Sequence, residues 1–154
     1  MKFRILAMMV LMLRGGPALA NSGWFWQNPL PQGNALRAIA APTTDIVVAV
    51  GSFGVILRSA DGGATWTLQS SGTDKVFLGV SFTDANTGTA VGEDSTILRT
   101  LDGGATWTPQ DSGTTNWLFG VSFTDTSNGT AVGLNGTIVR TIDGGATWTD
   151  LSQK

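Results

Sequence analysis

SADGGATWT at residues 59–67 returns as TLDGGATWT at 100–108 and as TIDGGATWT at 141–149, each copy 41 residues after the one before. A period near 40 residues, with several turn signals in each unit, is typical of a propeller blade or another solenoid repeat. Each unit is rich in Val, Thr, Phe and Gly and shows no apolar period of 3.6 residues, which argues against helical repeats. The repeated motif therefore decides the fold class, and we expect an all-β chain.

The second unit shows how one repeat divides into strands. Its apolar and β-branched runs predict strands at roughly 76–83, 88–93, 96–101 and 105–110, separated by the turn sequences DANT, EDS and DGG. Four short antiparallel strands in a unit of this length match one propeller blade. We predict a β-propeller-type array of three four-stranded antiparallel blades, preceded by one orphan strand at 23–28, which together make a partial propeller.

Each position of the motif S/T-x-D-G-G-A-T-W has a structural explanation. The aspartate carboxylate caps a hairpin by accepting hydrogen bonds from backbone N–H groups, and the glycines permit the positive φ that the tight turn needs. The tryptophan fills the space where neighbouring sheets diverge. The three aspartates fall at the same turn of three different blades, so we do not expect them to share one pocket. The predicted structural residues are Asp61, Gly63, Trp66, Asp102, Gly104, Trp107, Asp143, Gly145 and Trp148.

The motif is the Asp-box, also called the bacterial neuraminidase repeat. With AVG, ILR and SGT around it, the chain resembles the photosystem II stability/assembly factor-like propellers over about residues 21–150. The resemblance implies a non-enzymatic protein whose relatives have seven blades and assist photosystem assembly. The family often has Trp before AVG, whereas this chain has Val48, Thr89 and Thr130, so the surface that this Trp builds is not expected here.

The first 20 residues have the pattern of a secretory signal peptide. Lys2 and Arg4 are charged, residues 5–13 form an apolar run too short to span a bilayer, and small residues at 18–20 supply a cleavage site. Cleavage after Ala20 predicts a secreted or periplasmic protein that does not span a membrane; the alternative is an uncleaved membrane anchor. The other predicted boundaries are 21–33 for the N-terminal strand and its Pro-rich connector, 34–74 for blade 1, 75–115 for blade 2 and 116–154 for blade 3.

Composition removes several classes of function. Without the leader the chain keeps six basic and eleven acidic residues, a net charge of −5 with no Lys/Arg block, so we do not expect nucleic acid as a partner. The sequence has no Cys and no His, and we expect neither a metal nor a cofactor. Sialidases also carry Asp-boxes, and a resemblance to them would imply a tyrosine as the catalytic nucleophile. This chain has no Tyr. Glu93 and Asp94 are the only adjacent acids and fall in a turn, so we expect no enzyme.

One charged position recurs three residues before each box aspartate, as Arg58, Arg99 and Arg140. Period-2 alternation puts each arginine on the same strand face as the isoleucine two residues earlier. Two interpretations are open. Each arginine bridges to a neighbouring acid or covers a tryptophan ring, or the row binds an acidic or C-terminal segment of a partner protein.

Trp117 is the other candidate contact, because tryptophan is frequent at the energetic centres of interfaces. Its alignment with Val76 and Ala35 is also consistent with packing between blades. We predict a non-catalytic module for protein–protein interaction, with an unidentified protein partner. The alternative is a carbohydrate-binding module or a relic of an Asp-box glycosidase, since glycan stacking would use the same residue type.

Three blades are fewer than a closed ring contains, which is normally four to eight. Either the chain is a truncated piece of a longer array, or several chains assemble, for instance as a homodimer that closes a ring of six blades. Under both interpretations the two end blades present apolar faces that the three-bladed arc does not bury by itself.

Overall fold

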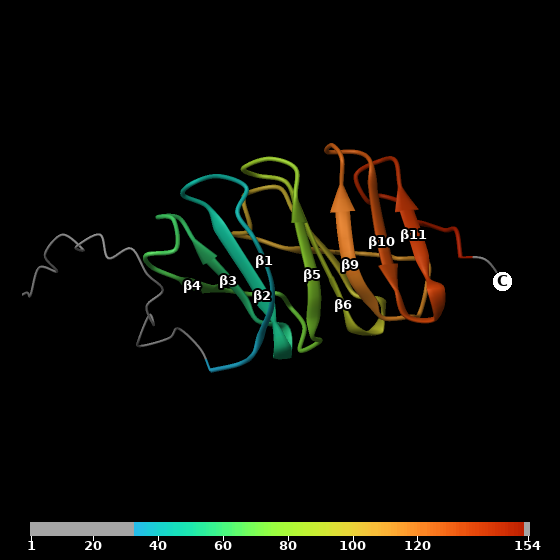
Figure 1. Cartoon of the computed structure of the whole chain (residues 1–154), viewed down its shortest axis with the longest axis horizontal. Coiled ribbons are helices and arrows are strands. Elements are labelled where there is room, and N and C mark those ends of the chain that lie inside the picture. Colours follow the sequence, from blue (N-terminus) through green and yellow to red (C-terminus); the bar gives the residue numbers. More distant parts are fainter. Residues whose placement is uncertain (1–32, 153–154) are drawn as a thin grey trace, which may run out of the picture.

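A computed structural model describes residues 33–152, which form three four-stranded antiparallel sheets arranged side by side in chain order (Figure 1). This confirms the predicted all-β array of three blades; the predicted leader and the orphan strand at 23–28 lie outside the described residues. Sheet A contains β1 (Leu36–Ala40), β2 (Val47–Gly51), β3 (Ile56–Ser59) and β4 (Thr67–Gln69). Sheet B contains β5 (Phe77–Phe82), β6 (Gly88–Gly92), β7 (Ile97–Thr100) and β8 (Thr108–Gln110), and sheet C contains β9 (Leu118–Phe123), β10 (Gly129–Gly133), β11 (Ile138–Thr141) and β12 (Thr149–Asp150).

The strands of each sheet follow their order in the chain, so every blade is a simple meander. The first strands β1, β5 and β9 are also neighbours across the sheet boundaries and make the most extensive strand-to-strand contacts between blades (Figure 1). The fourth strand of sheet B begins at Thr108 rather than near residue 105 as predicted. The reason is that Asp102 binds Thr106 through its backbone and its hydroxyl, which keeps this segment in the turn until after Trp107.

Two apolar clusters hold the blades together, and each lies between two sheets. We call the side of a sheet toward the next sheet in the chain its back face and the opposite side its front face. Strand alternation sends Ile56 and Arg58 to the back face of sheet A, while Leu57 points to the front. The first cluster contains Val48, Val50, Ile56, Phe77, Ala90 and Leu98; the second contains Val91, Ile97, Leu118, Ala131, Val139 and Trp148.

Short 3-10 turns join the second and third strands of each blade: η1 (Ser52–Gly54), η2 (Glu93–Ser95) and η3 (Leu134–Gly136). The first N–H of each turn donates to the carbonyl of a residue just before the first strand of the same blade, namely Ala35, Val76 and Trp117. We call this side of the molecule, made of the three turns and residues 73–76 and 114–117, the turn end. None of the helical segments in the described part of the chain is long and apolar enough to cross a membrane.

Candidate functional site

The box aspartates are bound within their own turns. Asp102 accepts hydrogen bonds from the backbone N–H and the hydroxyl of Thr106 at 2.9 and 2.6 Å, and from the Thr100 hydroxyl at 2.8 Å. The Thr100 hydroxyl in turn accepts from the N–H of Gly104, at 2.9 Å. Asp61 and Asp143 have the same partners at the equivalent positions of their blades.

These hydrogen bonds stabilise the ionised carboxylates. The hydroxyl and backbone bonds from Thr65 lower the pKa of Asp61 to about 2, and those from Thr147 do the same for Asp143. At Asp102 burial acts in the opposite direction, but the bonds from Thr106 still lower its pKa. Because the folded-state pKa lies below the unfolded value of about 4, the stabilisation is complete above pH 4 and is lost as the pH falls through about 2.

The glycines and tryptophans of the box shape the turn and the blade interface. Gly63, Gly104 and Gly145 have φ values of 91°, 87° and 89°, in a region of backbone conformation that residues other than glycine rarely adopt. The tryptophans pack on the front faces of their sheets. The ring of Trp107 meets Phe82 edge-on at 6.2 Å between centroids, and Trp148 meets Phe123 in the same way at 6.0 Å.

The carboxylates of the described residues do not converge. Within residues 33–152 no three side chains of the His, Cys, Asp and Glu types come close enough to hold a metal ion. A cavity of 540 Å³ between sheets B and C is lined by Asp102 and Asp111. Both acids are bound in turns, since Asp111 accepts a 3.0 Å hydrogen bond from the N–H of Gly113. This cavity therefore offers turn caps rather than an acid–base pair.

The arginines at the repeated position have different environments. Arg58 donates from Nε to the carbonyl of Gly103 in the next blade, at 2.8 Å. Arg99 is only 8% exposed and donates to the carbonyl of Thr126 in the next blade at 2.8 Å. Arg140 is exposed, and no residue in the described part of the chain accepts a hydrogen bond from its side chain.

Arg99 makes two further contacts. It donates to the Thr89 hydroxyl at 2.9 Å, and its guanidinium carbon lies 4.7 Å from the centroid of the Phe123 ring. Burial lowers its pKa, an effect that the negative charge of Asp84 opposes. Arg58 and Arg99 thus bind the following blade, and only Arg140 presents its guanidinium to solvent.

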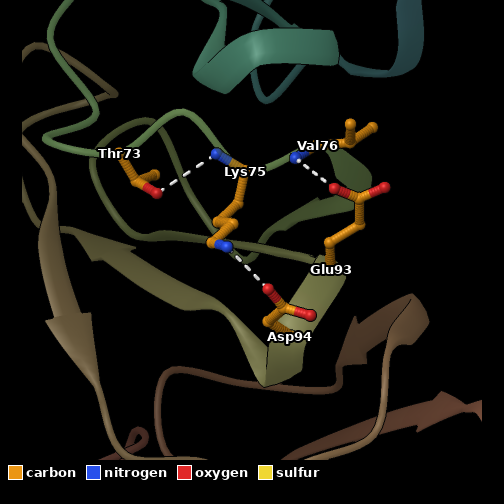
Figure 2. A network of polar contacts seen from close by, with 5 residues as sticks. All are labelled: Thr73, Lys75, Val76, Glu93 and Asp94. Carbon is orange, nitrogen blue, oxygen red and sulfur yellow. Dashed lines mark hydrogen bonds and ion pairs between the residues drawn. The ribbon is translucent and has the colours of Figure 1, made fainter.

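The turn end carries a second group of exposed side chains. Figure 2 shows its centre, where the ammonium of Lys75 binds the carboxylate of Asp94 at 2.6 Å. Glu93 accepts from the N–H of Val76 at 3.2 Å, which ties η2 to the first strand of its own blade (Figure 2). The hydrogen bond and the charge of Lys75 lower the pKa of Asp94, and the same pair raises the pKa of Lys75. Both side chains are exposed, so this ion pair contributes little to stability.

Exposed apolar residues also lie at the turn end. Phe53 in η1 of the first blade is 71% exposed, and Trp117 and Leu134 are exposed at the same end of the third blade. Phe53 also has φ 56° and ψ 39°. This left-handed conformation costs an ordinary residue about 1–2 kcal/mol. A bulky residue held in it without burial is a candidate for function.

Comparison with known proteins agrees with this architecture. The family model described as photosynthesis system II assembly factor YCF48 matches residues 66–116, which contain all of sheet B. YCF48 bound to D1 peptide matches with 26% identity and a TM-score of 0.71, over 81% of this chain and 43% of that one. YCF48 from Cyanidioschyzon merolae has the same identity and TM-score, over 82% of this chain and 42% of that one. The chain is a YCF48-like partial β-propeller. No curated protein sequence matches it, and it spans less than half the length of the two YCF48 structures.

Within this YCF48-like arc, the predicted contacts lie on separate surfaces. Trp117 is exposed at the turn end, whereas Arg58 and Arg99 are engaged between blades and Arg140 lies on the back face of sheet C. Sequence reasoning missed Phe53. A signal for it was available, because Phe53-Gly54 occupies the turn position where the third blade has Asn135-Gly136, the pair best suited to two successive positive φ values.

Proposed function

We propose that the chain is a non-catalytic propeller module that binds a protein partner at its turn end. The observation that carries this proposal is the match to YCF48, one structure of which is bound to D1 peptide. The fold is shared over four-fifths of this chain, and propellers commonly use the loops at one end of their blades to bind partners. The exposed side chains of Phe53, Trp117 and Leu134 supply apolar contacts on the first and third blades, and the Lys75–Asp94 pair supplies charges on the middle blade.

Phe53 allows a sharp test, because binding and stability should change in opposite directions. Phe53→Asn introduces the residue that the third blade uses at this position and relieves the left-handed strain. We expect the free energy of unfolding to rise by about 0.5–1 kcal/mol while partner capture falls at least about tenfold. Capture from an envelope fraction and direct titration with the D1 peptide would measure the second effect.

Two further variants control this experiment. Trp117→Ala should weaken capture as well, whereas Leu101→Asn should not, because Leu101 is equally exposed but lies in the Asp-box turn at the other end of its blade. Unchanged capture by both Phe53→Asn and Trp117→Ala would refute a turn-end site. Binding on a glycan array that disappears in Trp117→Ala would instead favour the carbohydrate-binding alternative.

The proposal places the module outside the cytoplasm. It depends on the leader predicted at residues 1–20, with its short apolar run and its small residues before position 21. N-terminal sequencing of the protein recovered from the periplasm or the medium should begin at Asn21. A protein that keeps Met1 and stays with the cytoplasmic fraction would contradict export.

A further inference from the structure

The cavity of 540 Å³ between sheets B and C lies beside the Asp-box turns of blades 2 and 3. Its volume is within the range of small-ligand sites, about 300–1,000 Å³. Both of its walls belong to blades that the second apolar cluster holds together. Its carboxylates offer no acid–base pair, so the question is what the cavity could bind rather than what it could cleave.

Arg99 is the cation of this cavity, and it is bound differently from its counterpart in blade 1. Arg58 donates from Nε to the carbonyl of Gly103, in the Asp-box of the next blade. Arg99 uses its two terminal nitrogens instead: one donates to the Thr89 hydroxyl and the other to a carbonyl of blade 3. The residue opposite Arg58 is Val48, which offers no such hydroxyl.

The carbonyl equivalent to that of Gly103 has another donor. Gly144 accepts a hydrogen bond from Nε2 of Gln110 at 3.4 Å. The Nε–H of Arg99 therefore has no acceptor within residues 33–152. Every fully buried side-chain nitrogen in these residues has a partner, so this N–H reaches solvent. Because Arg99 is only 8% exposed and lines the cavity, the N–H is directed into it.

The lining also offers a hydroxyl and a carboxylate oxygen. In blade 1 the hydroxyl of Thr67 donates to the carbonyl of Arg58 at 3.1 Å. Thr108 holds the same position in blade 2, and its hydroxyl has no partner in the described part of the chain. Asp111 accepts the N–H of Gly113 with Oδ1, which leaves Oδ2 able to accept from a ligand.

We propose that this cavity binds a neutral sugar ring, a hexopyranose either free or at the end of an oligosaccharide. The hydroxyls of such a ring both donate and accept, so they can pair with the Arg99 N–H, the Thr108 hydroxyl and the Asp111 carboxylate. Its C–H groups can contact Pro109 and Ala146, which are exposed in the lining. Two carboxylates and one guanidinium line the cavity, so an anionic ligand is disfavoured.

This binding is expected to be weak. Each hydrogen bond to the sugar replaces one to water, so its net contribution is small. No aromatic ring of the described residues lines the cavity, and the sugar therefore has no ring to stack on. We expect a Kd of about 1 mM. The site does not rest on the turn-end function, because none of its residues belongs to the turn end.

Saturation-transfer NMR of the purified full chain tests the proposal, with four neutral probes: methyl glucoside, methyl galactoside, methyl mannoside and N-acetylglucosamine. We expect at least one of them to bind, and the uronic acid matching that sugar to bind more weakly. Thr108→Val should weaken binding at least about fivefold, and Ala146→Phe should abolish it by filling the cavity. Thr149→Val is the matched control, because Thr149 is equally exposed at the same position of blade 3 but lies outside the cavity.

The outcomes separate this site from the turn end. Thr108→Val should leave partner capture unchanged, and Trp117→Ala should leave sugar binding unchanged. Cooperative urea unfolding of Ala146→Phe checks that this variant is folded. No binding of any neutral probe at about ten times the expected Kd, tighter binding of the uronic acid, or equal weakening by Thr149→Val would overturn the proposal. Sugar binding that is lost in Trp117→Ala and kept in Thr108→Val would also overturn it.

Discussion

Arg99→Met is expected to lower the free energy of unfolding by about 2–3 kcal/mol, and Arg140→Met by less than about 0.5 kcal/mol. Methionine keeps most of the apolar stem but removes the guanidinium. At Arg99 this leaves the carbonyl of Thr126 and the hydroxyl of Thr89 without their donor, and it removes the cation from the face of Phe123. Arg140 has no such contacts in the described part of the chain, and its side chain is exposed.

The comparison holds the repeat position and the chemical change constant, so it isolates the effect of the following blade. The loss for Arg58→Met should lie between the other two, because Arg58 donates one hydrogen bond of 2.8 Å to the carbonyl of Gly103 and is partly buried. Urea unfolding of the three variants measures the series. Equal losses at all three positions would show that the arginines do not act through the next blade.

This series also separates the two interpretations that the sequence left open for the arginine row. ILRT in the second blade and IVRT in the third are nearly identical, yet Arg99 is buried and Arg140 is exposed. The difference comes from sheet C, which covers one arginine and not the other. No local pattern encodes such a difference, because it depends on whether another sheet packs on that face.

Other features follow directly from the repeat. The period of 41 residues predicted three sheets, and the Asp-Gly-Gly turn predicted the capping bonds that Asp102 makes. The boundary at Trp107 could not be predicted from strand propensity, because it depends on the two bonds that hold Thr106 in the turn. The positive φ of Phe53 could not be predicted from the residue type for a related reason. Blade 1 has the same turn geometry as the other blades, although phenylalanine does not favour a positive φ.

The repeat also contains a correlated pair. Phe82 lies directly opposite Gly88 on the neighbouring strand, and Phe123 lies opposite Gly129. In blade 1 the same two positions hold Ala41 and Val47. A β-carbon on Gly88 would lie 2.6 Å from the Phe82 ring, well inside contact distance. The ring therefore occupies the space of a side chain on the opposite strand, and glycine is required wherever the phenylalanine is present.

Gly88→Val is accordingly expected to lower the free energy of unfolding by about 3 kcal/mol. The backbone at Gly88 is extended, so valine meets no conformational penalty there, and its β propensity is higher than that of glycine. The loss arises because the Phe82 ring must leave its edge-on contact with Trp107 in the cluster between sheets A and B. Gly120→Ala is the control, since a β-carbon there meets only Val132, at an ordinary 3.8 Å, and it should cost less than about 0.5 kcal/mol.

A double-mutant cycle shows whether the clash with Phe82 is the cause. Phe82→Ala alone removes a partly buried ring and should cost about 2–3 kcal/mol. Combined with Gly88→Val it reproduces the Ala–Val pair of blade 1, where both side chains fit. The double variant should therefore be at least about 1 kcal/mol more stable than the sum of the single losses predicts. Additive losses would mean that Gly88 is required for a reason other than the ring, whereas a favourable coupling would show that this cross-strand pair varies as one unit from blade to blade.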